Sequence, residues 1–114
     1  MTNENPLIEL WPGITRRTVT SGKTMYQMVA FLEPGSKVSE HRHPQEQLGY
    51  VLSGRIKMIV NGTPRELATG DYYYIASNIP HAVETIEKTR ILDTFSPPRD
   101  EYLAADEAYR NKSQ

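Results

Sequence analysis

Residues 35–54 read GSKVSEHRHPQEQLGYVLSG, with glycines at both ends and His41 and His43 between them. In an extended strand, side chains two residues apart lie on the same face, so we expect both imidazoles on one side and Arg42 on the other. Two imidazoles on one face can bind a first-row divalent metal ion. An isolated pair of this kind is more often a surface or hydrogen-bonded pair, so the surrounding sequence decides its meaning.

A third histidine stands in a second motif, residues 70–81, which reads GDYYYIASNIPH. His81 directly follows Pro80 and opens a predicted strand. Gln47 comes four residues after His43, at the start of another predicted strand. The chain contains 3 histidines, and one site would use all of them. This context favours a metal centre over three unrelated histidines.

Short runs of β-branched and aromatic residues alternate with turn signals over residues 7–95. Asn61-Gly62 is typical of a tight hairpin, because both central positions of that turn need a positive φ. Many short strands with regular turns predict an all-β sandwich or barrel. The predicted strands are Leu7–Trp11, Ile14–Thr20, Met25–Leu32, Leu48–Leu52, Arg55–Val60, Tyr72–Ile75, His81–Ile86 and Thr89–Phe95. By contrast, Glu101–Arg110 (EYLAADEAYR) is rich in helix formers and predicts a short C-terminal helix.

Length and composition limit the possible classes of protein. The 114 residues predict a single domain over 1–114, with a barrel core at about 7–96 and loose ends at 1–6 and 111–114. A net charge of −1 gives no basic excess for nucleic acid. With 0 cysteines, the chain has no disulfide, thiolate zinc site or iron–sulfur cluster. The sequence shows neither a signal peptide nor an apolar run of the roughly 20 residues that span a membrane, so we expect a cytoplasmic protein.

The two histidine motifs resemble those of the cupin superfamily. The matching positions are Gly35, His41, His43, Gln47 and Gly54 in the first motif, and Gly70, Pro80 and His81 in the second. The resemblance implies a double-stranded β-helix, or jelly-roll, barrel of the RmlC-like type. It also implies one divalent metal ion inside the barrel, held by the three histidines and a fourth ligand.

The fourth ligand departs from the usual cupin pattern, which has an acid where this chain has Gln47. Gln47 has the family spacing, and we expect it to coordinate. Neighbouring Glu46 is an alternative that requires a bulge, because it faces away in regular strand geometry. Three neutral imidazoles and a neutral amide leave the charge of the ion uncompensated, which favours a small anionic substrate. These ligands do not distinguish Zn, Ni, Fe or Mn.

A second group of candidate residues stands near the end, where residues 91–103 read ILDTFSPPRDEYL. Asp93 and Phe95 share one strand face by period two. Pro97-Pro98 cannot continue a central strand, and it restricts where Arg99 projects. The group would place an acid, an apolar wall and a carboxylate-binding guanidinium at one mouth. The alternative is a core phenylalanine, a turn acid and a surface arginine.

This segment, together with His-x-His-Pro-x-x-Gln and the YVLSG of residues 50–54, resembles the small pectin-degradation cupins. That family linearises 4,5-unsaturated monouronates into 5-keto-4-deoxyuronates, with a metal held by three histidines and a glutamine. The resemblance implies catalytic roles for Asp93, Phe95 and Arg99. It therefore implies a metal-dependent ring opening and tautomerisation of a small anionic sugar acid.

Two other functions stay open at this point. Three histidines can also hold Fe(II), as in a cupin-type dioxygenase or lyase, and a cupin can bind a small ligand without catalysis. Cupins commonly form homodimers by pairing barrel edges, and exposed strand edges need covering. The resemblance therefore implies a homodimer, with Leu7–Trp11 as a candidate for an exchanged strand.

Overall fold

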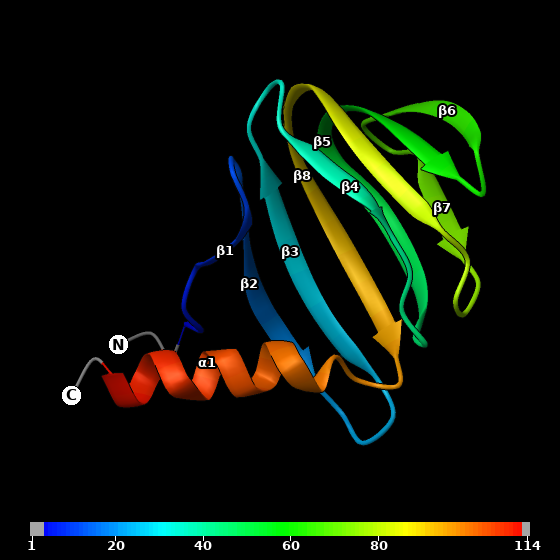
Figure 1. The fold of residues 1–114 in the computed structure, drawn as a ribbon. Helices are drawn as coiled ribbons and strands as arrows, with labels where there is room; N and C mark the ends of the chain where they lie inside the picture. Colours follow the sequence, from blue (N-terminus) through cyan, green and yellow to red (C-terminus); the bar gives the residue numbers. More distant parts are fainter. Residues whose placement is uncertain (1–3, 113–114) are drawn as a thin grey trace.

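The computed structural model describes residues 4–112, which form an antiparallel β-structure followed by one helix (Figure 1). The strands are β1 (Ile8–Trp11), β2 (Ile14–Ser21), β3 (Tyr26–Leu32), β4 (Lys37–His41), β5 (Glu46–Val60), β6 (Thr63–Ala68), β7 (Tyr72–Ile75) and β8 (His81–Ser96). The helix α1 is Asp100–Lys112. The predicted all-β class with a C-terminal helix is confirmed. No helix in the described range is long and apolar enough to cross a membrane.

Two long strands, β5 and β8, organise the sheet. Its order is β1-β2-β3-β8-β5-β6, while β4 pairs with β8 and β7 pairs with β5. The two long strands pair along their whole length, from Glu46 opposite Ser96 to Val60 opposite His81. Each of them exceeds the usual strand length, so its two halves join different neighbours and the sheet curls around a shared interior (Figure 1).

The predicted strands Leu48–Leu52 and Arg55–Val60 belong to one strand, β5, so the predicted break between them at Ser53-Gly54 is wrong. Gly54 has a φ of 106°, and the register of β5 against β8 shifts on both sides of Ser53. A Cβ on Gly54 would lie 2.3 Å from the carbonyl oxygen of Lys88. The glycine therefore marks a bulge that bends a continuous strand, and the single strand β8 likewise replaces two predicted ones.

Strand β6 was not predicted, because only Leu67 among its six residues is buried. Alternating burial is much clearer in the strands that line the interior, such as β3. The resulting core cluster contains Ile14, Ala30, Leu32, Val51, Ile56, Met58, Leu67, Tyr73, Ile75, Val83 and Ile91. Several of these residues, among them Ile14, Leu32 and Val83, also line the cavity that the three histidines line.

The N-terminal strand β1 pairs with β2 of its own chain, with Ile8 opposite Arg16. Its exchange between protomers stays a prediction. Of the ends expected to be loose, residues 1–3 and 113–114 lie outside the described residues. Within the described range, the side chain of Asn5 donates to the carbonyl of Thr18, and α1 continues to Lys112.

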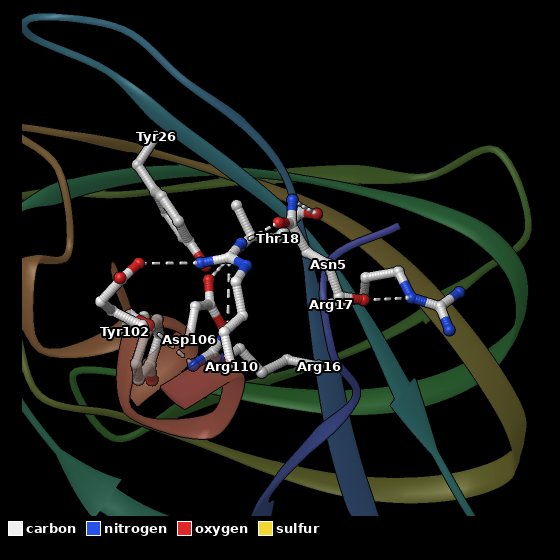
Figure 2. A network of polar contacts seen from close by, with 9 residues as sticks. Asn5, Arg16, Arg17, Thr18, Tyr26, Tyr102, Asp106 and Arg110 are labelled. Atoms are coloured by element: carbon white, nitrogen blue, oxygen red, sulfur yellow. Dashed lines mark hydrogen bonds and ion pairs between the residues drawn. The ribbon is translucent and has the colours of Figure 1, made fainter. Parts of the chain in front are cut away.

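A buried ion pair attaches α1 to β2 (Figure 2). Arg16 is 0% exposed, and its Nη1 atom donates to Oδ1 of Asp106 at 2.7 Å. Nη2 of Arg16 donates to the carbonyl of Tyr102 at 3.0 Å, and the hydroxyl of Thr18 donates to the other carboxylate oxygen of Asp106 at 2.6 Å. The charges of the pair are thus hydrogen-bonded from several directions, as buried charges require. The network holds the first turns of α1 over one end of the sheet.

Replacing Asp106 with alanine leaves the Arg16 guanidinium buried without its counter-ion. We therefore expect the free energy of unfolding to fall by about 3–5 kcal/mol, measured by urea denaturation. Glu107→Ala is the matched control, because the Glu107 side chain is 67% exposed on the same helix. The control should change stability by less than about 0.5 kcal/mol. Equal losses in the two variants would contradict a stabilising role for the buried pair.

Candidate metal centre

The three histidines converge in the structure. His41 is the last residue of β4 and stands opposite His81, the first residue of β8. His43 lies beyond the end of β4, so the expectation of one regular strand through both His41 and His43 is wrong. The loop still brings His43 to the others, and nitrogen atoms of all three rings lie within 4.8 Å of one another. This cluster has the residue types and the spacing to hold a metal ion.

Hydrogen bonds orient each imidazole. The Nδ1 atoms of His41, His43 and His81 lie 2.9, 3.0 and 2.8 Å from backbone carbonyl oxygens of their own segments. A carbonyl oxygen can only accept, so Nδ1 is assigned as protonated and Nε2 carries the free lone pair. The Nε2 atom of His81 is buried and has no hydrogen-bond partner among the described residues. An unpaired buried lone pair beside two other imidazoles fits a divalent cation.

Gln47 joins this cluster and Glu46 does not. Burial alternates along the start of β5, so Gln47 is buried while Glu46 is exposed and accepts a hydrogen bond from the hydroxyl of Tyr74. The side-chain oxygen Oε1 of Gln47 lies 3.2 Å from Nε2 of His43. Both of these atoms are acceptors once Nδ1 of His43 carries the proton, and a cation between them would satisfy both. Gln47 therefore fits the part of the fourth donor.

Asp93 holds Gln47 in this orientation. Its Oδ1 atom accepts hydrogen bonds from Nε2 of Gln47 at 2.9 Å and from the hydroxyl of Tyr73 at 2.6 Å. Asp93 is buried, and burial raises its pKa to about 6 although the two hydrogen bonds and Arg99 lower it. A carboxyl with that pKa can gain or lose a proton near neutral pH.

Tyr73 is a site residue that the sequence did not single out. Of three consecutive tyrosines in β7, only the middle one is buried, as period-two alternation requires. Tyr73 stands opposite Gly49 in the sheet, and a Cβ on Gly49 would lie 1.9 Å from Cζ of Tyr73. The sequence signal that could identify Tyr73 is the glycine opposite it on the neighbouring strand. That pairing can be recognised only when the strand register is known.

Burial also keeps two of the histidines neutral. It lowers the pKa of His81 to about 4, and the charges of His41, His43 and Arg99 act in the same direction. The pKa of His43 is lowered by burial first and then by Arg99. Neutral imidazoles are the form that binds metals, so these shifts suit ligands at neutral pH.

Arg99 and Phe95 lie at the same cavity. Phe95 is 2% exposed and its ring meets that of His43 edge-on, with centroids 5.6 Å apart. The Arg99 guanidinium lies 4.9 Å from the centroid of Phe95 and 4.2 Å from that of Tyr102. The cavity has a volume of about 70 Å³, and Trp11 also lines it, with its ring 6.2 Å from that of His41. Polar groups, aromatic walls and the histidine cluster thus converge on one small space.

Zinc or nickel ions added to chelator-treated protein should stabilise it, since the histidine cluster forms only in the folded chain. At 100 times the dissociation constant, we expect a gain of about 2.7 kcal/mol in unfolding free energy, measured by urea denaturation. His81→Ala should lose most of this gain. Magnesium is the matched control because it prefers oxygen ligands. An unchanged midpoint with zinc would contradict the metal centre.

The metal-free protein also tests the two opposite pKa shifts. Since the pKa of Asp93 is raised to about 6, its contribution to stability falls as the pH rises towards that value. The lowered pKa of His81, about 4, acts in the other direction, because the unfolded chain is protonated first as the pH falls below the usual histidine value. In wild type the two effects oppose each other.

Asp93→Asn removes only the first effect and keeps an oxygen that can accept both hydrogen bonds. We therefore expect the difference in unfolding free energy, wild type minus variant, to be larger at about pH 4.5 than at about pH 7. The change in this difference should be on the order of 2 kcal/mol. Urea denaturation of both proteins across this range measures the difference. A difference that does not vary with pH would show that Asp93 titrates normally.

Known proteins provide a comparison for this fold and site. Residues 28–95 match the Cupin domain family. The pectin degradation protein KdgF of Dickeya dadantii (strain 3937) is 33% identical over 103 residues, which are 89% of this chain and 94% of the relative. The solved structure of KdgF from Halomonas sp. has a TM-score of 0.81 at 26% identity, covering 85% of this chain and 90% of that one.

A solved RmlC-like cupin from Shewanella frigidimarina NCIMB 400 has a TM-score of 0.82 at 21% identity, covering 86% of this chain and 88% of that one. That likeness supports the fold alone. The predicted RmlC-like jelly roll and the resemblance to pectin-degradation cupins are both confirmed. With its family match spanning more than half of the chain, this protein belongs to the cupin family.

Proposed function

We propose that this cupin is a metal-dependent isomerase that opens and tautomerises a small anionic sugar acid, such as a 4,5-unsaturated galacturonate. The observation that carries the proposal is the chain of contacts from the histidine cluster through Gln47 to the buried carboxyl of Asp93. It supports a metal and a proton-transfer group acting on one substrate. The relative at 33% identity is a pectin degradation protein, and pectin is a polymer of galacturonate.

The donor set would leave a bound ion strongly electrophilic. His41, His43, His81 and Gln47 are the residues that would hold it, and all four donors are neutral. A divalent ion at this place supplies Lewis-acid polarisation of a substrate oxygen. With no carboxylate among these donors, its charge stays available to the substrate.

The proposed reaction is an isomerisation, so no co-reactant is needed. The proton on the C1 hydroxyl leaves, the bond between C1 and the ring oxygen breaks, and C1 becomes an aldehyde while that oxygen becomes an enolate at C5. Delivery of the same proton to C4 then converts the enolate to the 5-keto product. One group that accepts and returns a proton serves both steps, and the raised pKa of Asp93, about 6, suits that task.

The remaining residues bind and orient the substrate. Arg99 offers a planar guanidinium to the substrate carboxylate, and only 8% of the residue is exposed. Phe95 supplies an apolar wall beside His43, which excludes water from the reacting end. The hydroxyl of Tyr73 donates to Asp93 and keeps its carboxyl turned towards Gln47.

Turnover of 4,5-unsaturated galacturonate by the metal-loaded protein tests the proposal, with loss of the substrate followed by absorbance or NMR. Asp93→Asn should lower kcat by about 10²–10⁴-fold, because the proton acceptor is lost while the shape is kept. Arg99→Lys should mainly raise KM, because lysine lacks the planar guanidinium. Glu107→Gln, on the exposed side of α1, is the control and should match wild type.

Full turnover in Asp93→Asn would remove Asp93 from the mechanism. Iron-dependent oxygen uptake with an organic substrate would instead favour a cupin dioxygenase. Stabilisation by galacturonate without turnover of any unsaturated uronate would favour a ligand-binding module.

A further inference from the structure

Arg99 already has a carboxylate partner within the chain. Its Nε and Nη2 atoms lie 3.3 and 3.2 Å from Oε2 of Glu101. Glu101 is in the first turn of α1, and its side chain is 59% exposed, whereas that of Arg99 is 9% exposed. Among the described residues, Glu101 is the one carboxylate within ion-pair distance of Arg99.

The two sides of the Arg99 guanidinium meet different surroundings. Arg99 lines the cavity and Glu101 is not part of that lining, so the glutamate approaches from outside. The two contacts use Nε and Nη2, so the Nη1 atom is not engaged by Glu101. The rings of Phe95 and Tyr102 lie against the same guanidinium and restrict its rotation.

We propose that Glu101 sets the anion affinity of the site by partly neutralising Arg99 from outside the cavity. The inference rests on the proposed role of Arg99 as the carboxylate anchor. A bound sugar acid then either shares the guanidinium with Glu101, where the like charges repel, or displaces Glu101 and breaks its ion pair, and either event weakens binding. Because the product of an isomerisation keeps its carboxylate, weaker anion binding also favours product release.

The test measures binding of D-galacturonate, a saturated and unreactive probe, to the metal-loaded protein by titration calorimetry. Glu101→Gln removes the charge and keeps an oxygen that can accept from Arg99. We expect its Kd for galacturonate to fall roughly twofold to fivefold, as the loss of one partly exposed ion pair implies. The matched control Glu107→Gln, whose glutamate pairs with Arg110 on the same helix, should leave Kd unchanged.

An Arg99→Met background makes the test specific. There, Glu101→Gln should no longer strengthen binding, because the guanidinium that Glu101 neutralises is gone. A Kd that is unchanged or higher in Glu101→Gln with Arg99 intact overturns the proposal, and a higher value shows that Glu101 only positions Arg99. The same gain with Arg99→Met also overturns it. Failure to bind galacturonate in every variant overturns it too.

Binding and turnover are separate readouts. Tighter galacturonate binding in Glu101→Gln without turnover of the unsaturated uronate by wild type supports this inference and contradicts the proposed reaction. Turnover by wild type with unchanged binding in Glu101→Gln supports the proposed reaction and contradicts this inference.

Discussion

The pairing of β5 with β8 is the constraint on which the rest of the site depends. In its register, Gln47 stands opposite Phe95 and Gly49 stands opposite Asp93. The same ladder ends with Val60 opposite His81, so one pair of strands carries both the acid and a histidine of the cluster. A slip of one residue would turn every one of these side chains to the other face. The bulge around Gly54 bends the pair without breaking it, and the two ends therefore enclose a common interior.

Within that interior, burial and charge act together. Neutral donor atoms of the three histidines and Gln47 lie close together, while the acid Asp93 is hydrogen-bonded to Gln47. Burial raises the pKa of Asp93 to about 6 and lowers that of His81 to about 4, so each group favours its neutral form. The histidine and Gln47 side chains carry no negative charge, and Arg99 adds a positive one. An anion is the ligand that such a site accepts most readily.

The helix α1 takes part in this arrangement although it stands outside the barrel. Its buried ion pair with Arg16 fixes its position, and Tyr102 lies between two guanidiniums, 4.7 Å from that of Arg16 and 4.2 Å from that of Arg99. The helix residue Glu101 then reaches Arg99 from the solvent side. Stability and site geometry are therefore coupled at this end of the molecule.

Local pattern was enough to predict most strands, the C-terminal helix and the residues of the histidine cluster, because period-two alternation and turn chemistry act over a few neighbours. It failed at β6, where mostly exposed side chains hide the alternation. It also failed at Gly54, because a glycine with positive φ is typical of both a bulge and a turn. Motif resemblance, more than periodicity, pointed to Asp93 and Arg99.

Sequence alone determined which chemical groups are present: three histidines, an amide in the usual place of an acid, and no cysteine. Tertiary structure decided which of them meet. Only the register of β5, β7 and β8 puts Tyr73 and Gln47 on one carboxylate oxygen of Asp93. These contacts join residues far apart in the chain, so burial, pKa and pairing at the site arise from packing that no local pattern encodes.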